Sequence, residues 1–176
     1  MKTLNVVSRI VALLALVGAA TAATVMDQDV DNAIALFKKS DPKIQDLFKS
    51  AYGYAVLPKA GKGAAGIGVA AGEGQVFEKG KLVGTVKMSQ VTLGPQLGGQ
   101  SYAEVIFFET PQVMDDFKNG KFAMSAGLSA VAAADGAALT AKYQQGTMVF
   151  SIANNGLMFG ASVGGQKFHF EPVSER

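Results

Sequence analysis

The sequence predicts an α+β fold in which N-terminal amphipathic helices pack on a curved, mainly antiparallel, glycine-rich β-sheet or barrel-like sandwich. Two observations support this prediction. Apolar residues follow helical spacing between Asp27 and Ala51. From Gly53 onward, short runs of alternating or β-branched residues are separated by glycine, a pattern typical of strands joined by tight turns.

The N-terminal residues 1–22 have the composition of a signal peptide. Lys2 and Arg9 form a basic region, an apolar stretch follows, and Ala20-Thr21-Ala22 is a small-residue cleavage site. We expect cleavage near Ala22 and export to the periplasm, with membrane association left open. The alternative is a retained anchor, because the uncharged stretch from Ile10 to Met26 approaches the roughly 17 to 25 residues that span a bilayer.

The mature chain is expected to be one domain, with a helical segment at 23–52 and a β-rich part at 53–176. The full chain has 16 basic and 14 acidic side chains, and Lys2 and Arg9 leave with the leader, so the mature balance is 14 against 14. A neutral protein lacks the overall charge of a nucleic-acid binder. The absence of cysteine excludes disulfides, thiol catalysis and cysteine-ligated zinc.

Two helices are predicted in succession. The first spans Asp27 to Ser40, with acidic residues in its first turn and lysines in its last, as the helix dipole favours. The second begins with Ser40 as N-cap and Pro42 in the first turn. Both mix aspartate with lysine on their polar faces, so we expect them to pack on the core rather than lie on a membrane.

The β-rich part contains several predicted strands and turns. Glu78-Lys79-Gly80-Lys81 is a predicted turn, and Asn154-Asn155-Gly156 is the strongest hairpin signal in the chain. Thr110-Pro111 is expected to start a short helix that Gly120 ends, and for 122–141 a strand hairpin is favoured over a helix. The predicted strands are Tyr54–Leu57, Gly66–Ala71, Gln75–Phe77, Leu82–Val91, Val105–Phe108, Met148–Ile152 and Leu157–Val163.

No catalytic, cofactor or metal site is predicted. Residues 61–66 match the string G-x-G-x-x-G, but the following glycine-rich residues form a poor helix, which a dinucleotide site requires. His169 is the single histidine, and alternation with Phe168 and Phe170 directs it to solvent. Glu73 and Glu104 are isolated in the sequence, so no carboxylate pair or metal-ligand spacing emerges.

Lysines on predicted turns are the remaining candidates for a binding site. Lys59 and Lys62 flank the first glycine run, Lys79 and Lys81 lie on the hairpin, and Lys87 lies on the next strand. Lysine attracts phosphate as a point charge, so a folded sheet that gathers these residues is able to bind a lipid head group. The alternative is that they only keep the domain soluble.

Four blocks of the sequence resemble, in order, the SYLF domain family, which is also called the Ysc84 actin-binding domain. The resemblance runs from about Gly53 to Glu171. Its specific elements are Leu57-Pro58, Gly72-Glu73-Gly74, Gln96-x-Gly98-x-Gln100, the apolar strand Val105–Phe108 and Gly156-Leu157-Met158-Phe159-Gly160.

The resemblance implies membrane lipid binding, and in fungal relatives actin binding as well. Actin is not an expected partner of an exported bacterial protein, so anionic phospholipid or a membrane surface is the expected ligand. Ile152 to Asn155 replace basic residues that relatives often carry before the Gly-x-Phe hairpin. Lys59 and Lys62, which approximate the basic end of the family's Pro-x-x-x-Lys-x-Gly region, are therefore the better phosphate-binding candidates.

The expected function is non-enzymatic lipid binding in the cell envelope, through a glycine-rich sheet surface and loop lysines, without a cofactor. The competing hypothesis is a structural or self-associating envelope protein that binds protein partners through its sheet edges. An enzyme is disfavoured because no nucleophile and base lie within reach of each other by sequence.

Overall fold

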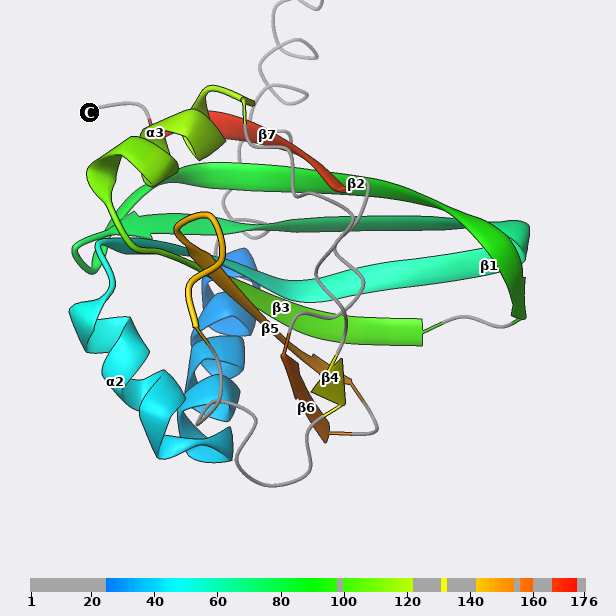
Figure 1. The fold of residues 1–176 in the computed structure, drawn as a ribbon, viewed down its shortest axis with the longest axis horizontal. Helices are drawn as coiled ribbons and strands as arrows, with labels where there is room; N and C mark the ends of the chain where they lie inside the picture. The colour runs from blue at the N-terminus through cyan, green and yellow to red at the C-terminus, as the bar shows by residue number, and fades with distance from the viewer. Residues whose placement is uncertain are drawn as a thin grey trace, which may run out of the picture.

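The computed structural model describes residues 25–97, 100–121, 131–132, 142–153, 156–159 and 166–173. These residues form a mixed α+β fold, as predicted: helices pack against one antiparallel sheet (Figure 1). The N-terminal helix is described over 25–40. The other elements are α2 (Pro42–Ser50), β1 (Gly53–Glu78), β2 (Lys81–Leu97), β3 (Gln100–Phe108), α3 (Pro111–Lys118), β4 (Val131–Ala132), β5 (Thr147–Ala153), β6 (Gly156–Phe159) and β7 (Gln166–Pro172). The predicted leader lies outside the described residues.

The seven described strands are arranged in the order β4-β6-β5-β3-β1-β2-β7, and all the pairings between them are antiparallel. The two ends of this order, β4 and β7, share no pairing among the described residues. A barrel-like closure therefore stays a prediction.

Strand β1 doubles back on itself, so that its two halves lie side by side (Figure 1). The half from Gly53 to Lys62 pairs with β3, and the half from Ala65 to Glu78 pairs with β2. A Cβ atom at Gly74 would overlap the carbonyl oxygen of Val56, which shows how closely the two backbones approach. Glycine permits this approach because it has no side chain.

The sequence predicts three separate strands over this region, Tyr54–Leu57, Gly66–Ala71 and Gln75–Phe77. The breaks between these predicted strands are therefore wrong. Glycines that sequence reasoning treated as interruptions lie within one continuous strand. That strand also runs through residues 61–66, so no helix follows the G-x-G-x-x-G string. The prediction that no helix follows this string is thus confirmed.

Two predicted hairpins are confirmed. Lys79 and Gly80 have φ values of 49° and 77°, the left-handed conformation that a tight two-residue hairpin turn requires at both central positions. At the second hairpin, β5 and β6 pair up to Ala153 opposite Gly156. The two asparagines between these residues lie outside the described part of the chain.

The helix starts are confirmed with one correction. Thr110 caps α3 as predicted, its side chain accepting from the Val113 amide. The N-cap of α2, however, is Asp41 and not Ser40: the Asp41 carboxylate accepts from the Lys43 amide at 2.8 Å. Ser40 instead donates its hydroxyl to the Phe37 carbonyl at 2.7 Å, which ends the N-terminal helix and leaves the next residue to cap α2. Of the ambiguous stretch 122–141, only β4 is described.

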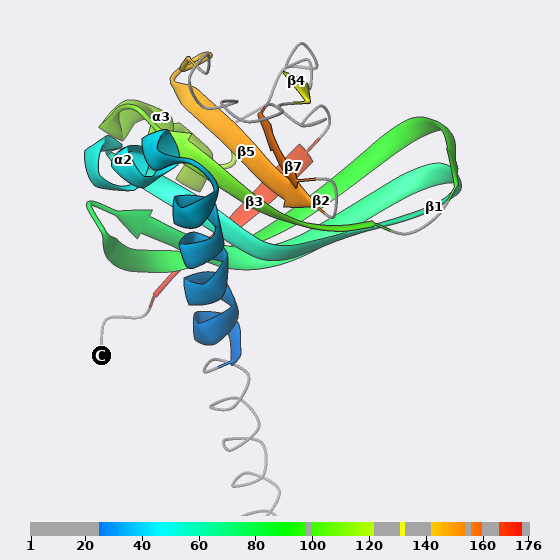
Figure 2. The ribbon, with the colours of Figure 1, turned by 90° about the horizontal axis from the view of Figure 1, so that it is seen from below.

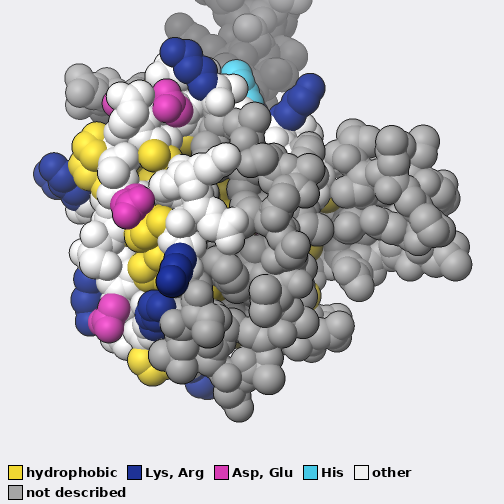
Figure 3. All heavy atoms as spheres, viewed as in Figure 1, with side chains coloured by type: hydrophobic (Ala, Val, Ile, Leu, Met, Phe, Trp, Pro, Cys, Tyr) yellow, Lys and Arg dark blue, Asp and Glu magenta, His cyan; other side chains and the backbone are white. Residues whose placement is uncertain are grey.

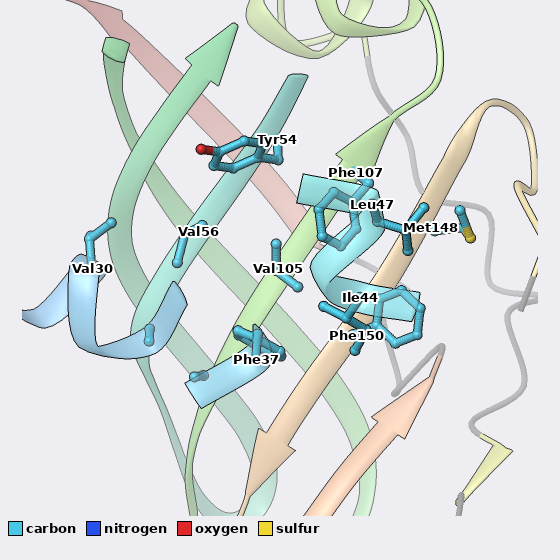
Figure 4. Close-up of a cluster of buried hydrophobic side chains, with 12 residues drawn as sticks. Val30, Phe37, Ile44, Leu47, Tyr54, Val56, Val105, Phe107, Met148 and Phe150 are labelled. Atoms are coloured by element: carbon cyan, nitrogen blue, oxygen red, sulfur yellow. The ribbon is translucent and has the colours of Figure 1, made fainter. Parts of the chain in front are cut away.

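One hydrophobic cluster fills the space between the sheet and the first two helices. Figure 2 shows the N-terminal helix lying across the strands, and Figure 4 shows side chains from both helices pointing toward those of β1, β3 and β5. Fully burying one such side chain contributes about 1.5–3 kcal/mol. The buried members of this cluster are Val30, Ala33, Phe37, Ile44, Leu47, Tyr54, Val56, Ala103, Val105, Phe107, Met148 and Phe150.

A second cluster fills the opposite face of the sheet beneath α3. Met114 and Phe117 of α3 contact it, and the Phe117 ring centroid lies 5.1 Å from that of Phe168 in β7. Gln166 of β7 reaches Glu104 of β3 on this same face, although β1 and β2 separate the two strands in the sheet order. The sheet therefore curls around this second cluster.

Replacing Gly74 with alanine tests the close approach within β1. Because the new Cβ would overlap the Val56 carbonyl, we expect a loss of about 2–3 kcal/mol in the free energy of unfolding, measured by urea denaturation. Gly61→Ala is the matched control, since a Cβ there meets nothing within 4 Å in the same strand. Equal stability of the two variants would contradict the doubled-back strand.

Candidate functional site

The Leu57-Pro58 sequence produces a bulge in β1 that carries Lys59. The pairing with β3 shifts by one residue between Leu57 and Ala60, so Pro58 and Lys59 lie in the irregular step. Proline lacks an amide hydrogen and is tolerated at such a bulge. The Lys59 side chain consequently projects to the surface, where it is 70% exposed.

A groove of about 540 Å³ begins at this bulge, and we call it the Lys59 groove. The N-terminal helix, both halves of β1, and β2 contribute to it, so its shape depends on β1 doubling back. Its surface combines apolar side chains with charged ones. The lining residues are Met26, Asp29, Pro58, Lys59, Ala71, Gly72, Glu73, Lys87 and Met88.

Both lysines of the groove have acidic partners nearby. Lys59 Nζ lies 2.8 Å from Asp29 Oδ2 of the N-terminal helix, and Lys87 Nζ lies 3.2 Å from Glu171 Oε1 of β7. The two lysine side chains are 70% and 55% exposed, and ion pairs this accessible to water are weak. An incoming anion is therefore able to compete with the carboxylates for both ammonium groups.

The hairpin lysines Lys79 and Lys81 lie at the other end of the β1–β2 pair. Lys79 lines a second pocket of about 590 Å³ with Phe48, Tyr52 and Glu109, and its Nζ lies 5.3 Å from the Tyr52 ring centroid. Lys79 is six positions along the chain from Glu73 of the Lys59 groove, a path of about 20 Å in an extended strand. Lys81 is exposed beside it. The structure thus places the predicted lysines in two separate regions.

Lys62 lies where β1 bends, opposite Gln100 of β3. Its side chain falls outside the described residues. Figure 3 shows basic and acidic side chains interspersed over the helical end of the molecule. The coloured part of this face therefore shows no large surface of one charge.

Glu78 joins three segments beside the second pocket. Lys118 of α3 donates to one carboxylate oxygen and the Tyr52 hydroxyl donates to the other, each at 2.7 Å. These two hydrogen bonds, that of Lys118 foremost, lower the pKa of Glu78. The two hydrogen bonds of Glu78 hold the hairpin turn against Tyr52 and α3. We therefore assign Glu78 a structural role at this end of the sheet.

Sequence reasoning missed the position of Glu104. This residue is fully buried in β3, and its carboxylate accepts two contacts from the Gln166 amide nitrogen, at 3.2 and 3.3 Å. Burial raises its pKa to about 7. Alternation along Glu104, Ile106 and Phe108 was the available signal, because it places the carboxylate on an apolar face. His169, by contrast, is exposed as predicted, and it lies 3.7 Å from Glu171.

Within the described ranges, no three acidic, histidine or cysteine side chains are grouped to hold a metal ion. Among the helices of the same described residues, none combines the length and apolarity needed to cross a bilayer.

Comparison with known proteins identifies related sequences. A family described as "Ysc84: Las17-binding protein actin regulator" matches residues 89–172. Beta cell expansion factor A of Aeromonas veronii is 30% identical over 139 residues, covering 78% of this chain and 53% of that protein. The chain thus spans about half the length of this curated relative. Neither name describes an enzyme.

The family match begins within β2 and ends at the last residue of β7. Glu104 and Gln166 lie inside the matched stretch, whereas Lys59, Glu73 and Lys87 precede it. The relative's similarity covers a larger share of the chain. Residues 89–172 of the chain thus match the Ysc84 (SYLF) domain family.

Proposed function

We propose that this protein binds anionic phospholipid at a membrane surface of the bacterial cell envelope, without catalysing a reaction. The observation that carries the proposal is the Lys59 groove, where two exposed ammonium groups flank apolar side chains. The match to the Ysc84 (SYLF) family, a resemblance that implies membrane lipid binding, supports the same class of ligand.

The chemistry of the groove suits the two parts of a phospholipid head. Lys59 and Lys87 are placed to contact phosphate oxygens as point charges. Pro58 and Ala71 offer apolar contact to the carbon atoms next to the phosphate. Lys62, Lys79 and Lys81 remain proposed as additional contacts with the membrane surface, outside the described groove.

Charge removal in the groove tests the proposal. Each lysine near an anionic membrane surface contributes about 1 kcal/mol, so Lys59→Ala/Lys87→Ala should weaken binding to vesicles containing phosphatidylglycerol about 30-fold. Flotation of the purified protein with these vesicles measures the change. Lys79→Ala/Lys81→Ala removes equal charge from the distant hairpin and should reduce binding less.

Equal losses in the two double variants would show that the groove has no special role. A wild-type protein that ignores both anionic and zwitterionic vesicles would refute lipid binding altogether. Size-exclusion chromatography without detergent then tests the competing function, because a self-associating envelope protein should assemble as its concentration rises.

Asp29 provides a second test in the opposite direction. Its carboxylate holds Lys59 at 2.8 Å, so Asp29→Asn should free that ammonium group and strengthen binding to the same vesicles, by up to about fivefold. Asp31→Asn is the control, since it removes the same charge from an exposed position of the same helix. If both variants bind equally well, the gain reflects net charge rather than release of Lys59.

We also propose that the protein is exported and cleaved near Ala22 before it binds lipid. The basic region, apolar core and small-residue site of residues 1–22 support this proposal. Intact-protein mass spectrometry of the periplasmic fraction should give the mass of a chain that begins at Ala23. Recovery of the full-length chain in the membrane fraction would indicate a retained anchor instead.

A further inference from the structure

A small group of buried polar side chains lies on the curled face of the sheet. Glu104 is at its centre, in β3, with Leu57 of β1 and Ser151 of β5 as its cross-strand neighbours. Gln166 of β7 donates its amide hydrogen toward both carboxylate oxygens. Each of these polar residues is at least nine-tenths buried, so water does not solvate the carboxylate.

No positive charge balances Glu104 among the described residues. Burial dominates its electrostatics, and the Gln166 hydrogen bond opposes burial only in part. Among the described residues, the titratable group that faces it is Tyr102, also in β3; burial and then the Glu104 charge raise the pKa of Tyr102, and a hydrogen bond with Gln166 opposes them. β1 and β5 contribute Leu57 and Ser151 as cross-strand neighbours, and β7 contributes Gln166, whose own neighbour in β2 is the buried Gln90.

The hydrogen-bonding capacity of the group is incompletely used. Within the described part of the chain, the Ser151 hydroxyl oxygen and the Gln166 amide oxygen are buried without a hydrogen-bond partner. An ionised carboxylate here would need several donors, yet Gln166 supplies a single amide nitrogen to both oxygens. A neutral carboxyl group suits this environment better, because an isolated buried charge costs far more than a buried polar group.

The contact also bridges strands that do not pair. Gln166 belongs to β7, which pairs with β2 at the end of the sheet order, whereas Glu104 belongs to β3. We propose that Glu104 and Gln166 form a protonation-controlled latch, which holds β7 over β3 in acid and loosens as the pH rises toward neutral. This inference is independent of the Lys59 groove and of lipid binding.

The direction of the pH effect follows from linkage. The folded-state pKa of about 7 lies above the ordinary value of 4.5, so the folded protein retains this proton after the unfolded or opened chain has lost it. The stabilisation is fully present below 4.5 and is lost as the pH rises through the folded value. Between pH 4.5 and about pH 7, the equilibrium between closed and opened states shifts toward opening by up to about tenfold per pH unit.

Loosening should begin at β7 rather than spread through the sheet. β7 is an outer strand of seven residues, held in the ladder by β2 alone among the described strands. Outer elements of this kind open locally at a lower free-energy cost than the central strands. β3, which pairs with both β1 and β5, should remain closed.

Native-state hydrogen exchange of the full protein between pH 5 and 8.5 tests the latch, after correction for the intrinsic pH dependence of exchange. In the wild type, protection of β7 amides should fall by up to about tenfold per pH unit until neutrality and then level off. Glu104→Gln cannot ionise, so its β7 protection should be independent of pH. Glu73→Gln, at an exposed carboxylate, should behave like the wild type. Identical profiles for wild type and Glu104→Gln would overturn the proposal.

A titration of the wild-type protein covers the case in which Glu104→Gln does not fold. Carbon-13 NMR of the glutamate carboxyl groups should show Glu104 titrating near neutrality, and the amide signals of β7 should shift with the same midpoint. A Glu104 midpoint below about 5, or β7 signals that do not follow it, would overturn the latch.

Discussion

The contact between the two halves of β1 is the constraint on which the rest of the structure depends. Backbone meets backbone where Gly74 faces Val56, a separation that no larger side chain permits, and Gly72 lies close to Ala60. Because the halves are adjacent, β3 is built on one and β2 on the other. The order of the central sheet therefore follows from glycines within a single strand.

The same constraint shapes the Lys59 groove. Pro58 displaces its neighbour outward from the first half of β1, and the small residues Ala71 and Gly72 of the second half leave space beside it. The N-terminal helix then covers one side, with Asp29 against Lys59 and Asp27 hydrogen-bonded to Gln75 at 2.6 Å. The shape of the groove is therefore determined by the backbone of β1, and the charged side chains are positioned by that shape.

Sequence reasoning succeeded where structure is decided locally. The Lys79-Gly80 turn, the Thr110 cap and the apolar stripes of the helices are each determined by residues a few positions apart, and all are observed. The N-cap of α2 was misplaced by one residue, because Ser40 and Asp41 are both good caps and only the bond from Ser40 to Phe37 distinguishes them. Local signals therefore predict elements better than their boundaries.

Features that depend on distant residues were not predictable in the same way. The glycines of β1 look like breaks unless the facing backbone is known, and Glu104 looks isolated unless Gln166, 62 residues later, is placed beside it. The lysines are similar: Lys59 and Lys87 converge only because β1 folds back, whereas Lys79 and Lys81 remain apart from them. Which distant residues become neighbours is decided by the order of strands in the sheet, and the spacing of residues along the chain does not reveal that order.

The late position of β7 in the chain has a consequence for synthesis. β2 pairs with β7 through contacts such as Lys87 with Glu171, which are 84 residues apart. Until residues 166–172 have emerged from the ribosome, that edge of β2 has no strand to pair with, and its amide and carbonyl groups form a template for other chains. The nascent chain therefore exposes this edge of β2 until β7 has been made.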